Sequence, residues 1–134
     1  MRWLALLLLI PSLAWGNAGE IGKIKGSGAI ERGSNSLEAV NGLGIEIQDT
    51  AVTANATMRI DFIDETRVDI TEHSRLLIDE FVYDPANDLG SLSIKATLGT
   101  VRYASGQIAK NFRQNVKIRT PSATIGVRGT DFIM

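Results

Sequence analysis

Hydrophobic and polar residues alternate with a period of two along much of the chain, which is the period of a β-strand. The apolar stripes fall at Met58, Ile60 and Phe62; Val68 and Ile70; Leu92, Ile94, Ala96 and Leu98; Val101 and Tyr103; Val116 and Ile118; and Ala123, Ile125 and Val127. A helix would repeat its apolar positions every three to four residues, and no long segment does so. The sequence therefore predicts a series of short strands.

Turn-forming residues separate these stripes, at positions 64–66, 71–74, 85–90, 99, 106 and 111–115. Glycine, proline, asparagine and aspartate suit turns for distinct conformational reasons. Short strands at such spacings predict an all-β fold, in which antiparallel, roll-like strands form a sandwich or an irregular β-solenoid. No exact repeat is present, and no linker divides the chain after residue 18.

One segment, residues 75–83, departs from the alternation because it is apolar at both odd and even positions. Phe81, Val82 and Tyr83 favour a strand, and we expect this strand to be covered on both faces. A short helix is the alternative interpretation.

The first 18 residues have the pattern of a secretory signal peptide. A short positive start at residues 1–2 precedes an apolar run at residues 3–10, and Pro11 follows. Small residues then allow cleavage after Gly16 or Ala18. A membrane anchor would need about 20 apolar residues, and this run is far shorter.

The chain has no cysteine, which excludes disulfides, lipid attachment at the cleavage site and thiol chemistry. Loss of residues 1–18 would remove one charged residue, Arg2, and shift the formal net charge from −1 to −2. Such a balance argues against nucleic acid as a partner, since phosphate backbones need a concentrated basic face. A periplasmic or secreted location is expected.

Near the end, residues 116–132 read V-K-I-R-T-P-S-A-T-I-G-V-R-G-T-D-F, which resembles the signature of the FecR domain family. Residues 47–53, 58–70 and 92–101 resemble upstream segments of the same family in order and spacing. The likeness covers residues 42–134, with residues 19–41 as lead-in strands. The structural signature consists of Thr120, Pro121, Ala123, Gly126, Arg128, Gly129, Thr130 and Phe132.

The signature has the features of a fold-defining corner rather than an active site. Pro121 biases the residue before it toward an extended conformation. Phe132 has the opposite parity to Ala123, so the apolar face must switch between them, and a bulge near Arg128 and Gly129 would achieve this. We expect Arg128 to be folded under the corner, with Asp131 or Asp49 as its partner; a solvated surface arginine is the alternative.

The resemblance implies a non-enzymatic extracytoplasmic domain that transmits or receives a signal through contacts with another protein of the envelope. The best-known members are regulators of iron-uptake sigma factors, in which a cytoplasmic segment and a membrane helix precede this domain. Here the signal peptide takes that place, as in secreted members. Relatives usually continue past the signature, so the sequence leaves open whether the chain is a piece of a longer protein.

An alternative is a cell-surface or wall-associated module that has a structural role or binds glycan. Exposed aromatic side chains would favour it, and Tyr83, Tyr103 and Phe112 are the candidates. Packing of these rings in the core is the competing interpretation.

No catalytic, cofactor-binding or metal-binding residues are predicted. His73, the single histidine, is expected in a turn. The acidic cluster Asp61, Asp64, Glu65 and Asp69 lacks the alternating acids and glycine of a calcium loop, and Asp61 and Asp69 fall on the polar face of strands. The glycines at Gly22-Lys23 and at residues 26–28 fail the spacing tests for phosphate-binding loops.

Overall fold

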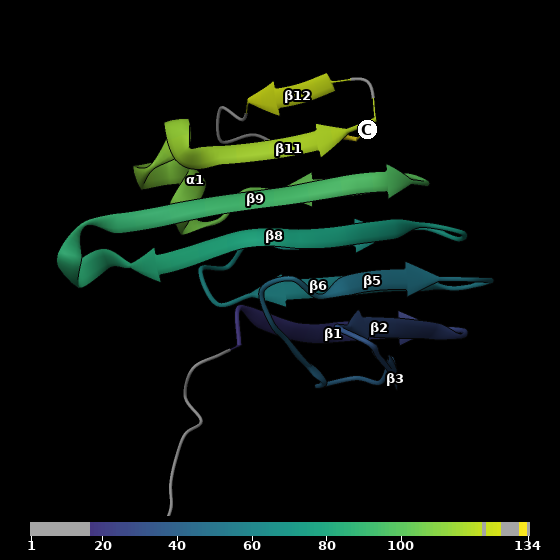
Figure 1. The fold of residues 1–134 in the computed structure, drawn as a ribbon. Coiled ribbons are helices and arrows are strands. Elements are labelled where there is room, and N and C mark those ends of the chain that lie inside the picture. Colours follow the sequence, from purple (N-terminus) through teal and green to yellow (C-terminus); the bar gives the residue numbers. More distant parts are fainter. Residues whose placement is uncertain (1–16, 122, 127–131, 134) are drawn as a thin grey trace, which may run out of the picture.

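The computed structural model describes residues 17–121, 123–126 and 132–133 of the chain. Most of these residues lie in strands that form two sheets, and the helical segments are short. The strands stack one above another, from the N-terminal end at the bottom of Figure 1 to the C-terminal end at the top. The all-β prediction is therefore confirmed, whereas the predicted signal peptide lies almost entirely outside the described residues.

The strands, in chain order, are β1 (Gly19–Lys25), β2 (Gly28–Arg32), β3 (Asn35–Glu38), β4 (Gly44–Ile45), β5 (Thr50–Thr53), β6 (Thr57–Phe62), β7 (Arg67–Ile70), β8 (Arg75–Asp84), β9 (Leu89–Leu98), β10 (Val101–Ala104), β11 (Val116–Thr120), β12 (Ala123–Gly126) and β13 (Phe132–Ile133). The helical segments are η3 (Pro85–Asn87), α1 (Gln107–Asn111) and η4 (Arg113–Asn115).

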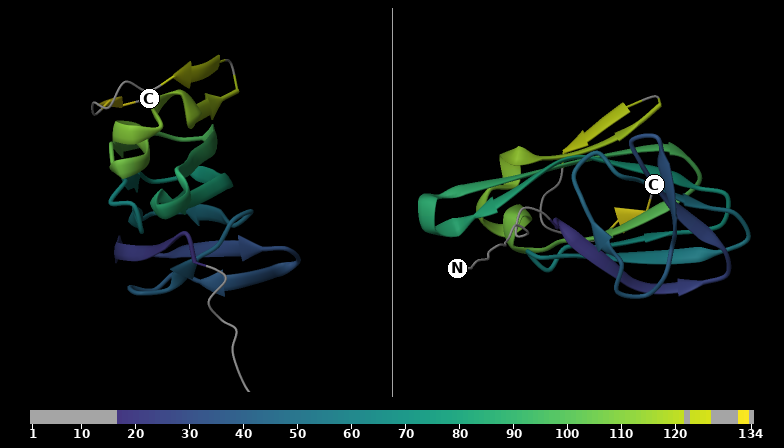
Figure 2. Two further views of the ribbon diagram at one scale, coloured as in Figure 1. Left: turned by 90° about the vertical axis from the view of Figure 1, so that its left-hand side faces the viewer. Right: turned by 60° about the horizontal axis from the view of Figure 1, so that its bottom comes forward.

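From β1 and β2 onward, each sheet adds its strands in chain order, whereas β4 and β3 pair on the outer side of β1 and β2 at the N-terminal end. The six-stranded sheet has the order β13-β10-β7-β6-β1-β4, and the seven-stranded sheet has the order β12-β11-β9-β8-β5-β2-β3. Neighbouring strands are antiparallel except for β9 and β11, which are parallel. The sheets lie on opposite sides of the molecule and do not close into a barrel (Figure 2, right).

The core lies between the two sheets and is built from the predicted apolar stripes. Its buried side chains include Met58, Ile60, Phe62, Val68, Ile70, Leu92, Ile94, Ala96, Val101, Tyr103, Val116 and Ile118. Leu98 is an exception and is 56% exposed. The register with β8 shifts beside it, because Arg75 pairs with Leu98 whereas Leu76 pairs with Ala96. The extra residue of β9 turns Leu98 outward. The stripe predicted at residues 123–127 reaches beyond the described side chains.

Strand β8 confirms the strand interpretation of residues 75–83 and corrects the expectation about their burial. A bulge at Asp79 shifts the register, so that Ile78 pairs with Ile94 and Glu80 pairs with Ser93. Because of the extra residue, Ile78 and Phe81 both face the core although their parities differ. The prediction that both faces are covered was wrong, since Val82 on the outer face is 39% exposed.

Two aromatic contacts join the parts of the core. Phe62 of β6 and Phe81 of β8 stack with ring centroids 5.3 Å apart, which connects one sheet to the other. At the helical end, Gly90 leaves room for the ring of Phe112, because a Cβ at that position would overlap the ring. This close approach packs the segment after α1 against β9.

Candidate interaction sites

The signature contributes strands to both sheets. Thr120 of β11 pairs with Ala123 of β12, and Pro121 lies in the turn between these two strands. The signature's Gly126 ends β12 in the seven-stranded sheet. Phe132 of β13 pairs with Tyr103 in the six-stranded sheet. The described residues of the signature therefore lie in β12 and β13, the C-terminal edge strands of the two sheets, and at the end of the neighbouring β11 and in the turn that follows it.

The centre of the signature is not covered by these observations. Arg128, Gly129, Thr130 and Asp131 lie outside the described residues, so the predicted bulge and the burial of Arg128 stay predictions. One part of that prediction can be compared with the structure: Asp49, the more distant partner considered for Arg128, is engaged by a different arginine.

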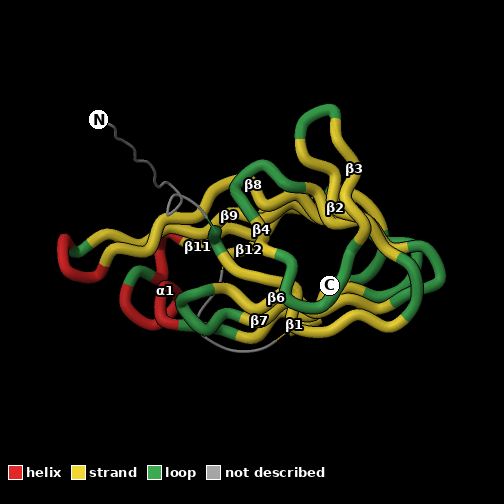
Figure 3. Tube along the Cα trace, turned by 90° about the horizontal axis from the view of Figure 1, so that it is seen from below, coloured by secondary structure: helices red, strands yellow, loops and turns green. Residues whose placement is uncertain are grey.

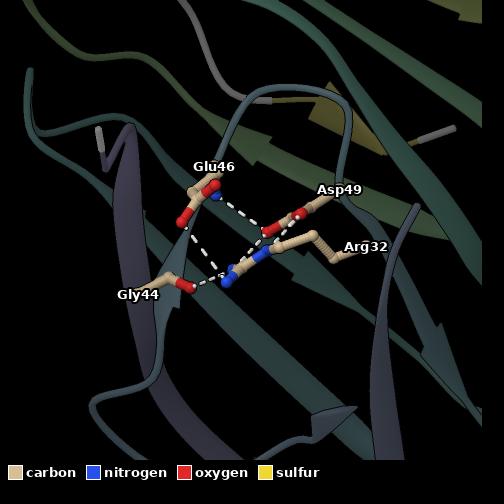
Figure 4. A network of polar contacts seen from close by, with 4 residues as sticks. All are labelled: Arg32, Gly44, Glu46 and Asp49. Atoms are coloured by element: carbon tan, nitrogen blue, oxygen red, sulfur yellow. Dashed lines mark hydrogen bonds and ion pairs between the residues drawn. The ribbon is translucent and has the colours of Figure 1, made fainter. Parts of the chain in front are cut away.

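That arginine is Arg32, at the end of β2 (Figure 4). Its Nε donates to Oδ1 of Asp49 at 2.9 Å, and its Nη2 donates to Oδ2 at 2.8 Å. Nη2 also donates to the carbonyl oxygen of Gly44 at 2.9 Å. Nη1 lies 3.3 Å from a carboxylate oxygen of Glu46, whose backbone N–H donates to Oδ2 of Asp49 at 2.8 Å.

The network holds the connection between β4 and β5, where the chain crosses from one sheet to the other, against the end of β2. Asp49 is only 1% exposed, and its carboxylate accepts three hydrogen bonds, so its buried charge is compensated. The hydrogen bond to Asp49 raises the pKa of Arg32, opposed by its partial burial. An arginine held in its charged form cannot act as a base, and the arrangement is a structural clasp.

A second buried carboxylate fixes the short helix. Oδ1 of Asp64 accepts from the backbone N–H of Thr66 at 3.0 Å, and Oδ2 accepts from the Thr66 hydroxyl at 2.8 Å. Oδ2 also accepts from the backbone N–H of Ile108 at 2.9 Å, in the first turn of α1. The turn between β6 and β7 thus supplies the cap that α1 lacks from its own N-cap glycine.

The other acidic residues of the predicted cluster behave differently. Asp69 pairs with Arg59 across the neighbouring strands at 2.9 Å, and Asp61 lies 3.4 Å from Arg67. These pairs lie on the outer face of the six-stranded sheet, as the alternation predicted. No group of three His, Asp or Glu side chains in the described part of the chain is arranged to hold a metal ion.

His73 lies in the turn between β7 and β8, as expected, with its side chain exposed. Its φ of 56° is left-handed, and its N–H donates to the carbonyl oxygen of Ala54 at 2.9 Å. This hydrogen bond ties the turn to the segment after β5. The histidine therefore has a clear backbone role in the turn.

A small polar hollow of about 220 Å³ lies on the outer face of the seven-stranded sheet, over β8, β9 and β11. The Ser91 hydroxyl donates to Glu80 at 2.6 Å, and the Ser93 hydroxyl donates to Asp79 at 3.3 Å. Arg119 lies 3.7 Å from the same Asp79 carboxylate. These polar side chains pair with one another across the strands.

Exposed apolar side chains mark the hairpin of β8 and β9. Val82 is 39% exposed and Leu89 is 51% exposed, and both lie near its tip. The tip, with η3, extends beyond the neighbouring strands (Figures 1 and 3). Val40 and Ile47, in the loops on either side of β4, are also exposed.

The aromatic side chains considered for glycan binding are not displayed on a surface. Tyr103 is fully buried and Phe112 is 9% exposed, and Tyr83 packs partly buried against the core. Their core-packing interpretation is confirmed.

A family model described as FecR protein matches residues 49–134, and the chain belongs to this family. Its match begins at Asp49 of the clasp and includes the signature. Membership suggests a signalling or regulatory protein of the envelope. No curated protein and no solved structure matches the chain. No helix in the described part is long and apolar enough to cross a membrane.

Proposed function

We propose that the protein is a non-enzymatic, extracytoplasmic module of the bacterial envelope that signals through contact with another envelope protein. The observation that carries this proposal is the FecR family match over residues 49–134. The signal-peptide pattern of residues 1–18 supports export. Because an exported chain without cysteine has no disulfides, the stability of its fold must come from the hydrophobic core and from buried polar networks such as that of Arg32 and Asp49.

The chemistry of the polar groups supports a binding role over catalysis. The buried carboxylates of Asp49 and Asp64 are occupied by structural donors. The single histidine, His73, lies in a turn. A general base must be free to accept a proton from a substrate, and these two carboxylates are already engaged by structural donors.

The projecting hairpin of β8 and β9 is the surface that we propose contacts the partner. Val82 and Leu89 present apolar side chains near its tip, and Asp84 adds a charge beside Leu89. Interfaces combine an apolar centre with a polar rim, and this tip offers both on a small scale. With two exposed apolar side chains, the tip fits a transient signalling contact better than an obligate one.

Site-directed photo-crosslinking in the exported protein tests this function. A photoreactive residue at Val82 or at Leu89 should capture one defined envelope protein in living cells. The same residue at Lys95 or at Thr97, exposed positions at the other end of β9, is the matched control. Equal capture from both ends, or none from the hairpin, would argue against the proposed contact.

The glycan-binding alternative loses its main support, because the described aromatic candidates are buried or half-buried. A sugar-binding platform stacks rings on exposed aromatic faces. We therefore keep protein contact as the proposed function.

A further inference from the structure

The inference starts from a bulge in β1. Ile21 pairs with Ile60 of β6, and Lys23 pairs with Arg59, so Gly22 is an extra residue without a partner. In a regular strand, Ile21 and Lys23 would point to the same face. The extra residue reverses the parity after it, so that Lys23 and Lys25 are exposed while Ile24 packs against the core.

The extra residue, Gly22, lies next to the side chain of Asp61 on the neighbouring strand β6. A Cβ on Gly22 would overlap the carboxylate of Asp61. This carboxylate is the end of a half-exposed side chain that can turn aside, so a larger residue at position 22 would displace Asp61. The bulge itself turns two lysines to the outer face of the six-stranded sheet.

Strand pairing then lines up charged residues across that face. Lys23 of β1 is opposite Arg59 of β6, which is opposite Asp69 of β7, which is opposite Arg102 of β10. Adjacent strands are about 4.8 Å apart, so this row spans roughly 14 Å. Next to it lies a second row, which contains Lys25, Thr57 and Thr71.

The two rows line a hollow of about 300 Å³. Four cationic side chains and one carboxylate surround it, and the carboxylate of Asp69 is engaged by Arg59 at 2.9 Å. Within the part of the chain that the structure describes, Lys23, Lys25 and Arg102 form no ion pair. The hydroxyls of Thr57 and Thr71 add hydrogen-bonding groups to the lining.

We propose that this hollow, called the basic hollow from here on, binds a ligand that carries more than one phosphate charge. Three cations without carboxylate partners lie around one small concavity, so a multiply charged group can contact several of them at once. A phosphate offers several acceptor oxygens to arginine and lysine donors, whereas one carboxylate offers two. The formal net charge of −1 means that recognition must come from this local cluster.

This site is not a phosphate-binding loop. That agrees with the sequence, because the glycine spacing around Gly22-Lys23 does not match the motif of such a loop. The donors here are side chains on a sheet face, brought together by strand pairing. The proposal goes beyond the signalling function and does not depend on it, because the basic hollow and the β8–β9 hairpin lie on different sheets.

Calorimetric titration of the exported chain with tripolyphosphate at low ionic strength tests the site. The K23A/K25A/R102A variant should bind at least about tenfold more weakly, the equivalent of about 1.4 kcal/mol. The control K95A/R113A/K117A removes the same charges from exposed positions elsewhere. Equal losses in the two variants, or no binding by the parent, would overturn the proposal.

A third variant and a second probe sharpen the result. Asp69→Asn removes the one carboxylate of the hollow and should tighten tripolyphosphate binding severalfold; unchanged or weaker binding counts against the assigned site. Vesicles that contain cardiolipin, whose headgroup carries two phosphates, compared with vesicles of phosphatidylcholine alone, then separate the sources. Binding to the anionic vesicles that K23A/K25A/R102A abolishes indicates a lipid headgroup, and binding to tripolyphosphate alone indicates a free phosphate ligand.

Discussion

Four aspartates of this domain fall into two pairs that differ in burial. Asp49 and Asp64 are almost fully buried, and each accepts several hydrogen bonds. Asp61 and Asp69 lie on the outer face of a sheet, half-exposed, and each is close to one arginine. The same side chain thus has two roles, and the number of donors follows the degree of burial.

The difference has a physical cause. A carboxylate taken out of water loses its hydration, so it persists only where protein donors replace the lost water. On the surface, water competes with each ion pair and leaves it worth little. We therefore expect the buried aspartates, Asp49 and Asp64, to hold the loops and the helix in place. The exposed aspartates, Asp61 and Asp69, should contribute mainly to the surface charge.

The largest expected effect is that of Arg32→Ala. It leaves the charge of Asp49 buried with only the N–H of Glu46 as donor. Loss of one partner of a fully buried pair costs about 3–5 kcal/mol; because Arg32 is 32% exposed, we expect about 2–3 kcal/mol. In urea this corresponds to a midpoint lower by about 1–2 M.

The pH dependence of this effect follows from the direction of the pKa shift. The pKa of Arg32 is raised in the folded state, chiefly by its hydrogen bond with Asp49. The resulting stabilisation is fully present below the pKa of the unfolded chain and is lost only as pH rises through the higher folded value. The difference between parent and Arg32→Ala should therefore stay constant from about pH 6 to about pH 9. A difference that falls within this range would contradict the assignment.

The next effect is that of Asp64→Ala, which removes the acceptor for Thr66 and for the N–H of Ile108. Buried donors left without a partner cost about 1–3 kcal/mol, and we expect about 2 kcal/mol. Amide hydrogen exchange at residues 107–111 should also become faster. Asp61→Ala, on the outer face, is the matched control, and an equal loss of stability in both variants would remove the distinction between the two pairs.

The strands were readable from the sequence because the alternation of apolar residues is local information. Met58, Ile60 and Phe62 point inward as the pattern predicts. The bulges at Gly22 and Asp79 were not predicted, since each arises from pairing with another strand. The extra residues at Gly22 and Asp79 each reverse the parity, which is why Lys23 faces outward and Phe81 faces inward.

The polar networks could not be predicted from the sequence, because they join residues that only the tertiary fold brings together. Arg32 and Asp49 are 17 residues apart, and Asp64 and Ile108 are 44 residues apart. No local motif connects them, and α1 is too short to show helical periodicity. An aspartate in a turn, followed two residues later by threonine, is a signal for a local hydrogen bond within the turn. This signal predicts the bond between Asp64 and Thr66, but it does not predict the bond between Asp64 and the distant helix α1.

The smallest expected effect is that of Arg59→Ala, which completes the comparison from the exposed side. The hydrogen bond with Asp69 raises the pKa of Arg59, yet both side chains of the pair are partly exposed, at 37% for Arg59 and 35% for Asp69, so the pair is screened by salt. We expect the stability of this variant to equal that of the parent in about 1 M NaCl, where the Debye length is about 3 Å. Any loss should appear only at low ionic strength. Arg32→Ala should keep most of its deficit at high salt, because Asp49 is shielded from solvent. Urea unfolding of the parent and both variants at two salt concentrations measures this. If high salt removed both deficits alike, burial would not be what separates the two kinds of aspartate.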